Sequence, residues 1–178
     1  WAAAADKEMQ NFIDFSVLDD TPYDSDDVRR YPDAIFGNVI PVRAVKNEDA
    51  GPPSAAPSQD GGPELAQEPR IRGVFNAPQA TDSDGRPAQF PAGYMMPAST
   101  LEIRIVLFIA LLLGFVVQQF DVSGAYLHAA LTGVTFVRLA PELEAAYNRL
   151  RGVPGRRLGR WWRLLRALYG HPSAGFEW

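Results

Sequence analysis

The sequence of 178 residues predicts a mixed α+β fold, because helix and strand patterns occur along the same chain. Residues 1–12 favour helix formers and place Met9 and Phe12 three apart, as on one face of a short amphipathic helix. Residues 39–45 read as a strand, and in residues 70–75 charged and apolar side chains alternate as in a half-buried strand. The length suits one domain, or one domain with a loose segment, and allows a real core.

Composition and charge exclude some classes of protein. The hydrophobic content of 47% is ordinary, and the net charge of -4 argues against a basic nucleic-acid-binding protein. The charge is uneven, since acids dominate the first fifty residues while residues 149–171 hold seven arginines and no acid. The absence of cysteine excludes disulfides and thiolate metal sites. No signal peptide is visible, and both ends look cut, so we expect a fragment of a longer polypeptide.

The first segment, 1–46, is predicted to hold the amino-terminal helix and edge strands, because Pro41 cannot donate to a strand ladder. Residues 19–33 are acidic and broken by prolines, and their irregular spacing predicts a solvated loop rather than a carboxylate metal site. The second segment, 47–69, is rich in Pro, Gly, Ala and Ser and predicts a disordered insertion or flexible linker.

The third segment, 70–96, is predicted to hold the strand at 70–75 and a turn at 82–86. The fourth, 97–178, opens with Ser99 as a possible helix cap and Glu102 in the first turn. The apolar run at 105–117 is shorter than the ~20 residues that cross a bilayer. It therefore predicts a buried core helix and no membrane partner, and residues 120–126 predict a strand or strand end.

The basic stretch at 155–169 interleaves apolar residues with arginines at helical spacing. One interpretation is a surface helix whose arginine stems cover apolar side chains. The other is a basic strip that faces phosphate backbones, which arginine binds well. Of the two histidines, we expect His128 to be a polar residue at the edge of a strand and His171 to lie in a turn.

Asp121 is the residue with the clearest chemical interpretation. Its carboxylate follows directly on a long apolar run, and Tyr126 lies five positions further on. A carboxylate at the end of a buried element needs a partner, for which a hard divalent cation is a good candidate. A solvated strand end or a helix cap is the alternative.

Three blocks of the chain resemble, in order and spacing, the reverse transcriptase domain of copia-type LTR retrotransposons. The first runs from Gln119-Phe120-Asp121-Val122 through Ala125-Tyr126-Leu127, and the second is the aromatic-to-proline strand at 136–141. The third holds Leu168-Tyr169-Gly170 and ends in Trp178. The resemblance is good over 97–178 and thin over 1–96.

The resemblance implies a partial fingers and palm of a right-hand polymerase. Asp121 would be the catalytic carboxylate that binds Mg²⁺, and the backbone carbonyl of Val122 would complete the shell of that ion. Tyr126, with Ala125 before it, would select deoxynucleotides by pushing against a ribose 2′ hydroxyl, although a core aromatic is the alternative. Arg72 would contact the phosphates of the nucleotide. The residues implied near template and primer are Arg160, Arg163, Arg166, Tyr169 and Gly170.

The sequence also departs from the family pattern. Asn76-Ala77 stands where the family has Lys-Gly, Gly73 stands where a branched apolar residue is usual, and the insertion at 49–69 has no compact counterpart. The hairpin that carries the family's other two carboxylates does not occur in these 178 residues. A two-metal site needs those carboxylates, so we expect this chain alone not to polymerise.

The resemblance therefore implies a fragment of an RNA-directed DNA polymerase from a retrotransposon polyprotein. Its partners would be deoxynucleotides, an RNA template with a DNA primer, and the remainder of the polyprotein. Its location would be intracellular, in a cytoplasmic particle or the nucleus. The alternative is a decayed, non-catalytic remnant that binds nucleic acid through its basic carboxy-terminal stretch.

Overall fold

The structure is a computed structural model that describes residues 1–46, 68–90, 98–120, 122–152 and 160–178. These residues form six α-helices, four strands and one 3₁₀ turn, which confirms the mixed α+β prediction. The elements in chain order are α1 (Ala2–Asp14), α2 (Ser25–Val28), β1 (Ile35–Lys46), β2 (Glu68–Phe75), η2 (Ala77–Gln79), α3 (Thr100–Leu113), α4 (Ala125–His128), β3 (Ala130–Leu139), α5 (Pro141–Leu150), β4 (Trp162–Arg166) and α6 (Ala174–Glu177).

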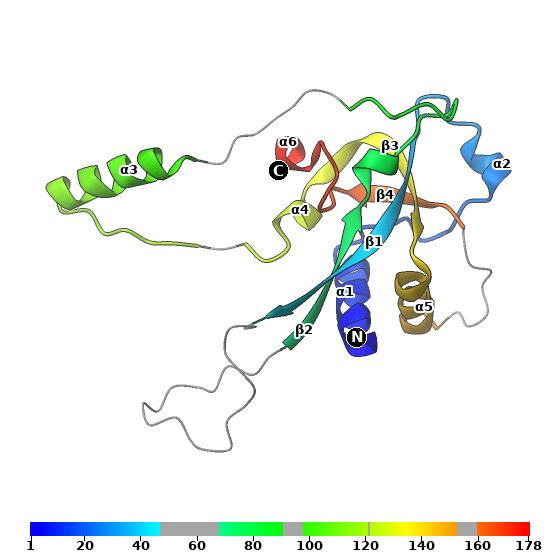
Figure 1. Ribbon diagram of the computed structural model, residues 1–178, viewed down its shortest axis with the longest axis horizontal. Helices are drawn as coiled ribbons and strands as arrows, with labels where there is room; N and C mark the ends of the chain where they lie inside the picture. The colour runs from blue at the N-terminus through cyan, green and yellow to red at the C-terminus, as the bar shows by residue number, and fades with distance from the viewer. Residues whose placement is uncertain (47–67, 91–97, 121, 153–159) are drawn as a thin grey trace, which may run out of the picture.

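The four strands form one sheet in the order β2-β1-β3-β4 (Figure 1). β1 pairs antiparallel with β2 and parallel with β3, and β3 pairs antiparallel with β4. Val39 lies at the centre, opposite Phe75 on one side and Leu139 on the other. The sheet thus joins strands from three of the segments distinguished in the sequence.

Helices α1 and α5 pack side by side against one face of the sheet (Figure 1). The buried face of α1 carries Met9 and Phe12, which join Leu143 of α5 and Leu164 of β4 in the main core. Arg149 of α5 also forms an ion pair with Asp6 of α1. The amphipathic helix predicted at the amino end is therefore confirmed.

Aromatic side chains cover the opposite face of the sheet. The Phe136 ring is fully buried and makes edge-to-face contacts with Tyr23 at 5.2 Å and Tyr31 at 5.3 Å between centroids. The segment before α2 also covers the outer edge of β4, where the Leu165 N–H donates to the Val17 carbonyl at 2.8 Å. This edge of the sheet is therefore closed by the chain itself.

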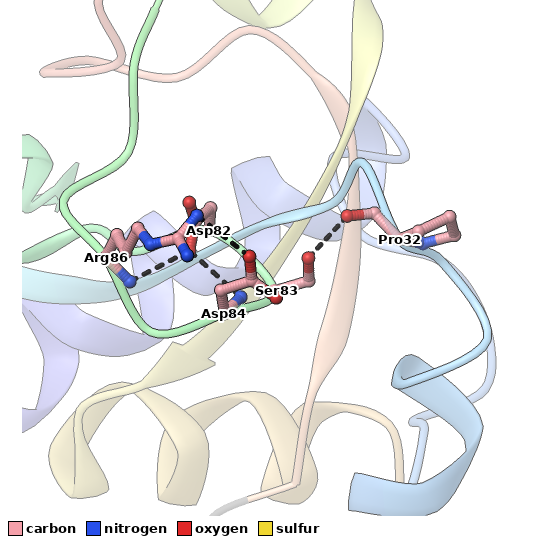
Figure 2. A network of polar contacts seen from close by, with 5 residues as sticks. All are labelled: Pro32, Asp82, Ser83, Asp84 and Arg86. Atoms are coloured by element: carbon pink, nitrogen blue, oxygen red, sulfur yellow. Dashed lines mark hydrogen bonds and ion pairs between the residues drawn. The ribbon is translucent and has the colours of Figure 1, made fainter.

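The predicted turn at 82–86 is confirmed (Figure 2). Asp82 Oδ1 accepts the N–H groups of Asp84 at 2.9 Å and Arg86 at 2.8 Å, which is how a short acidic side chain organises a turn. The Ser83 hydroxyl donates to the Pro32 carbonyl, so the turn is anchored to the loop before β1.

The core-helix prediction at 105–117 is correct in type and wrong in environment. Ser99 and Glu102 form the predicted cap as a reciprocal capping box, and Gly114 ends α3 in the left-handed conformation. Figure 1 shows α3 held away from the sheet, and within the described part of the chain Ala110 is its one buried residue. Phe108 is 61% exposed and Leu111 79%, because no described element packs against this helix. None of the helices in the described ranges has the length and apolar content needed to cross a bilayer.

The carboxy-terminal helix predicted at 155–169 is wrong where the structure describes it, since residues 162–166 form β4. Trp162 and Leu164 are buried while Arg163 between them is half-buried, which is the two-residue period of a strand. Arginines recurring every three residues masked that period in the sequence. Residues 155–159 lie outside the described part of the chain.

The strand predicted at 39–45 lies within β1, whose neighbours change along its length. Residues 35–39 pair with β3 and residues 39–46 pair with β2, so Val39 is the one position that pairs with both strands. Pro41 lies in the latter range, where its missing N–H interrupts no ladder to β3. Of 120–126, predicted as a strand or strand end, Phe120 and Val122 have no regular structure, a turn follows, and α4 begins at Ala125. Of the predicted linker at 47–69, residues 47–67 lie outside the described part, and Glu68 and Pro69 begin β2.

Candidate functional site

A cavity of about 590 Å³ lies between α1, β2 and the turn that precedes α4. Charged side chains of both signs line it. The cations are Lys7, Arg70 and Arg72, and the carboxylates are Glu8, Asp14 and Glu68. Val122, Ser123 and Gly124 form the wall contributed by the turn. We call this space the α1–β2 cavity.

β2 positions the arginines through its alternation. Ile71, Gly73 and Phe75 are buried against the core, so Arg70 and Arg72 point to the exposed face. The Arg72 guanidinium lies over the Tyr169 ring, 4.8 Å from its centroid. This cation–π contact gives a flexible, exposed arginine a defined position at the cavity wall.

Gly73 is the departure from the family pattern that the structure explains. A Cβ at this position would lie 2.8 Å from Cζ of Phe12, a buried ring of α1. The α1 helix therefore occupies the space that a branched side chain would need. The missing side chain lets α1 approach β2 closely, which also narrows the cavity between them.

Glu8 is a site residue that the sequence analysis missed. It is buried on α1, and its Oε1 accepts the Gly73 N–H at 2.9 Å. Burial raises the pKa of Glu8, while the Gly73 hydrogen bond, the Asn11 amide and the charges of Arg72 and Arg70 oppose that effect. The signal was present, since position 8 shares the apolar stripe of Ala5, Met9 and Phe12.

The Leu168-Tyr169-Gly170 block closes the sheet beside the cavity. Leu168 is fully buried, and the Tyr169 carbonyl accepts the Phe75 N–H at 2.8 Å, beyond the end of β4. Gly170 has φ +80°, and a Cβ there would lie 2.4 Å from the Phe75 carbonyl oxygen. Glycine is thus required for two reasons: the positive φ disfavours other residues, and a Cβ would clash with the Phe75 carbonyl.

Ala125 and Tyr126, which were predicted at a nucleotide site, are the first two residues of α4. The Tyr126 ring contacts the Tyr169 ring edge-to-face at 5.2 Å. Tyr126 is not among the lining residues of the α1–β2 cavity, and it reaches the site through this contact. Ala125 donates its N–H to the Val122 carbonyl at 3.2 Å, which ties the predicted backbone ligand into the turn.

Asp121, the predicted metal-binding carboxylate, lies outside the described residues. Within the described ranges no three His, Asp or Glu side chains gather as a metal ion would require. Val122 and Gly124 do line the cavity, so the chain adjoining Asp121 runs along its wall.

The three arginines predicted to bind nucleic acid do not form a single helical strip. Arg160 lies before β4, with Nε 3.8 Å from Oδ1 of Asp24. Arg163 is half-buried within β4, opposite Phe136. Arg166 ends the strand, and its Nη1 donates to the His128 carbonyl at 3.3 Å. Arg163 and Arg166 lie in β4 and Arg160 precedes it, so the three arginines do not share one face of a helix.

Comparison of the chain with protein-family models, with curated protein sequences and with solved structures finds no match.

Proposed function

We propose that this chain is the amino-terminal fingers-and-palm part of a copia-type reverse transcriptase, and that the α1–β2 cavity receives the incoming deoxynucleotide with Mg²⁺. The proposal rests on the sequence blocks described above and on one geometric observation. Arg72 of β2, Tyr126 of α4 and Tyr169 after β4 are far apart in the sequence and meet at one place. Tyr126 and Tyr169 belong to two of the three blocks, and Arg72 lies in the upstream strand, where the resemblance is thin.

The charges around the cavity support a nucleotide rather than a purely anionic or cationic ligand. Lys7, Arg70 and Arg72 suit a triphosphate, since arginine and lysine are the usual partners of phosphate oxygens. Carboxylates lie on the same wall and would repel a bare polyanion. A magnesium–nucleotide complex carries less negative charge, and its metal is bound by carboxylate oxygens.

The proposed roles come from the resemblance. Asp121 and the carbonyl of Val122 would hold the metal. Bound Mg²⁺ would neutralise the phosphates and stabilise charge on the leaving pyrophosphate. Arg72, positioned by Tyr169, would contact the phosphates from β2. Tyr126, with Ala125 at its side, would meet the sugar.

Nucleotide binding tests this proposal directly. The Kd of a fluorescent dATP analogue is measured with Mg²⁺ and with EDTA for the wild type and for Arg72→Gln. We expect binding that needs Mg²⁺ and is weakened about tenfold or more by Arg72→Gln, which removes charge-assisted contacts. Asp121→Asn should abolish the Mg²⁺-dependent binding.

Arg138→Gln is the matched control, because Arg138 also lies over an aromatic ring, that of Trp161 at 4.2 Å, away from the cavity. It should leave the Kd unchanged. Equal losses in Arg72→Gln and Arg138→Gln, or tight binding in EDTA, would refute a specific phosphate contact.

The alternative, a non-catalytic nucleic-acid-binding remnant, is separated by its own assay. It predicts salt-sensitive RNA binding that survives Asp121→Asn and weakens in the double variant Arg160→Gln, Arg163→Gln. Arg163 lies in β4 and Arg160 precedes that strand, which gives the alternative less support than a continuous basic helix would have given.

A further inference from the structure

A second cavity of about 290 Å³ lies apart from the α1–β2 cavity, between the start of β3 and α6. Its walls are mostly apolar, formed by Ile35, Phe90, Leu131 and Phe176. His171, Thr135 and Glu177 also line it. We call it the His171 cavity. An apolar cavity of roughly half this volume holds a benzene molecule, so there is room here for one ring with a polar substituent.

The protonation state of His171 is set by its surroundings. The Ser173 N–H donates to Nδ1 at 3.3 Å, so the proton of the neutral imidazole lies on Nε2. His171 is only 6% exposed, and burial lowers its pKa to about 4 although the charge of Glu177 opposes that shift. Near neutral pH the ring is therefore an uncharged donor.

The Nε2–H of His171 has no acceptor among the described residues, and the atom is screened from water. Buried donors are almost always paired, because an unpaired one forfeits its hydration without compensation. The Phe75 ring packs at 4.9 Å and the Phe90 ring at 5.3 Å from the imidazole, so its nearest aromatic neighbours offer no oxygen. Because Nε2 presents almost no surface to a water-sized probe, an acceptor in this cavity reaches it only when the imidazole turns toward the cavity, and that contact would recover the lost interaction.

We propose that the His171 cavity binds a small neutral aromatic carbonyl compound of the benzamide class, whose ring packs on Phe90 and Leu131 and whose carbonyl oxygen accepts the Nε2–H of His171. The charges set the class. A carboxylate ligand would be repelled by Glu177. An ammonium ligand has no acceptor to offer the Nε2–H of His171. A carboxamide supplies the acceptor for His171 and an N–H₂ group for the Glu177 carboxylate. This site does not depend on the polymerase proposal.

The test uses the full 178-residue chain labelled with ¹⁵N-histidine. Benzamide is titrated while the Nε2 resonance is followed in a long-range ¹H–¹⁵N spectrum. We expect a saturable shift at Nε2 of His171. Toluene, which has the ring without the acceptor, should bind about tenfold more weakly and leave that resonance nearly unchanged.

Two variants distinguish the hydrogen bond to His171 from the volume of the cavity. His171→Phe keeps a ring between Phe75 and Phe90, and it should bring benzamide and toluene to equal affinity. Leu131→Trp fills the cavity and should abolish binding of both. Asp121→Asn should leave benzamide binding intact, which keeps this result distinguishable from the nucleotide experiment.

The wild type alone decides the outcome if a variant fails to fold. Equal affinities for benzamide and toluene, or a benzamide titration without a saturable Nε2 shift, would overturn the proposal.

Discussion

Helices α1 and α3 are of similar length, but they differ in how far their side chains are buried and in how their ends are capped. α1 buries Ala5, Met9 and Phe12 against the sheet, while α3 exposes most of its large apolar side chains. α3 has the better ends, with a capping box and a left-handed glycine, whereas the Trp1 cap of α1 makes no side-chain hydrogen bond.

The comparison teaches that local signals decide whether a helix forms, and that a contrast between its faces decides where it packs. α1 has apolar side chains along one face and mostly polar side chains elsewhere, so a single orientation of the helix on the sheet buries the apolar face. From Ile105 to Leu113 α3 is apolar on every side and offers no such contrast. Its capping and composition specify a helix without specifying a partner.

The largest expected difference between the two helices comes from paired phenylalanine truncations. Phe12→Ala should lower the free energy of unfolding by roughly 3 to 5 kcal/mol, because it opens a cavity beneath β2. Phe108→Ala, on α3, should change it by less than about 0.5 kcal/mol. Urea unfolding followed by fluorescence measures both, and a large effect of Phe108→Ala would show that α3 packs on the core in solution.

Gly170 and Gly114, which both have a positive φ, give a second comparison between the core and α3. Gly170→Ala should cost roughly 3 kcal/mol, since the new Cβ meets both an unfavourable φ and the Phe75 carbonyl. Gly114 has φ +67° with open space around it, so Gly114→Ala should fray the end of α3 without moving the global transition. Thermal unfolding of both variants checks this, and equal shifts would contradict it.

The pH dependence of the core is the third test. The pKa of His171 falls from 6.5 to about 4 on folding, so the unfolded chain binds its proton first as the pH drops. This group leaves stability unchanged above pH 6.5 and lowers it between pH 6.5 and 4, by up to roughly 3 kcal/mol. Denaturant titrations across that range measure the slope. His171→Phe should flatten the slope, and an unchanged slope in that variant would contradict the assignment.

The smallest effect is expected at the start of α3. Hydrogen bonds from Ser99 lower the pKa of Glu102, so the capping contribution is present at neutral pH and is lost as the pH falls through that lowered value. Glu102→Gln should speed amide hydrogen exchange at 101–104 and leave exchange in the strands unchanged. A coupled change in the strands would indicate that α3 and the sheet unfold together.

Much of the fold could be predicted where the signal is local. The Met9–Phe12 spacing predicts α1, Ser99 and Glu102 predict the cap of α3, and the alternation at 70–75 predicts most of β2. β4 could not be predicted, since its period appears only when Trp162 and Leu164 are set against β3. The exposure of α3 depends on the absence of an opposing surface among the described residues, and a local sequence pattern does not report that absence.

The candidate site divides in the same way. Arg72 and Tyr169 could be singled out from the sequence by resemblance, but their contact depends on bringing β2 beside the end of β4. Glu8 was missed because a lone acid in a helix is usually solvated. The position of Glu8 on the apolar stripe indicates burial, but its partner, the Gly73 N–H, is known only from the structure. The position of Asp121 remains a prediction.

The parallel pairing of β1 with β3 has a consequence for how the protein is made. Val39 meets Leu139, a hundred residues later in the chain, so the central ladder is a pairing of very high contact order. At about 5 to 20 residues per second, a ribosome leaves β1 without that partner for several seconds to tens of seconds. The apolar helix α3 emerges within this interval. A chaperone that holds α3 during synthesis should therefore raise the yield of folded protein.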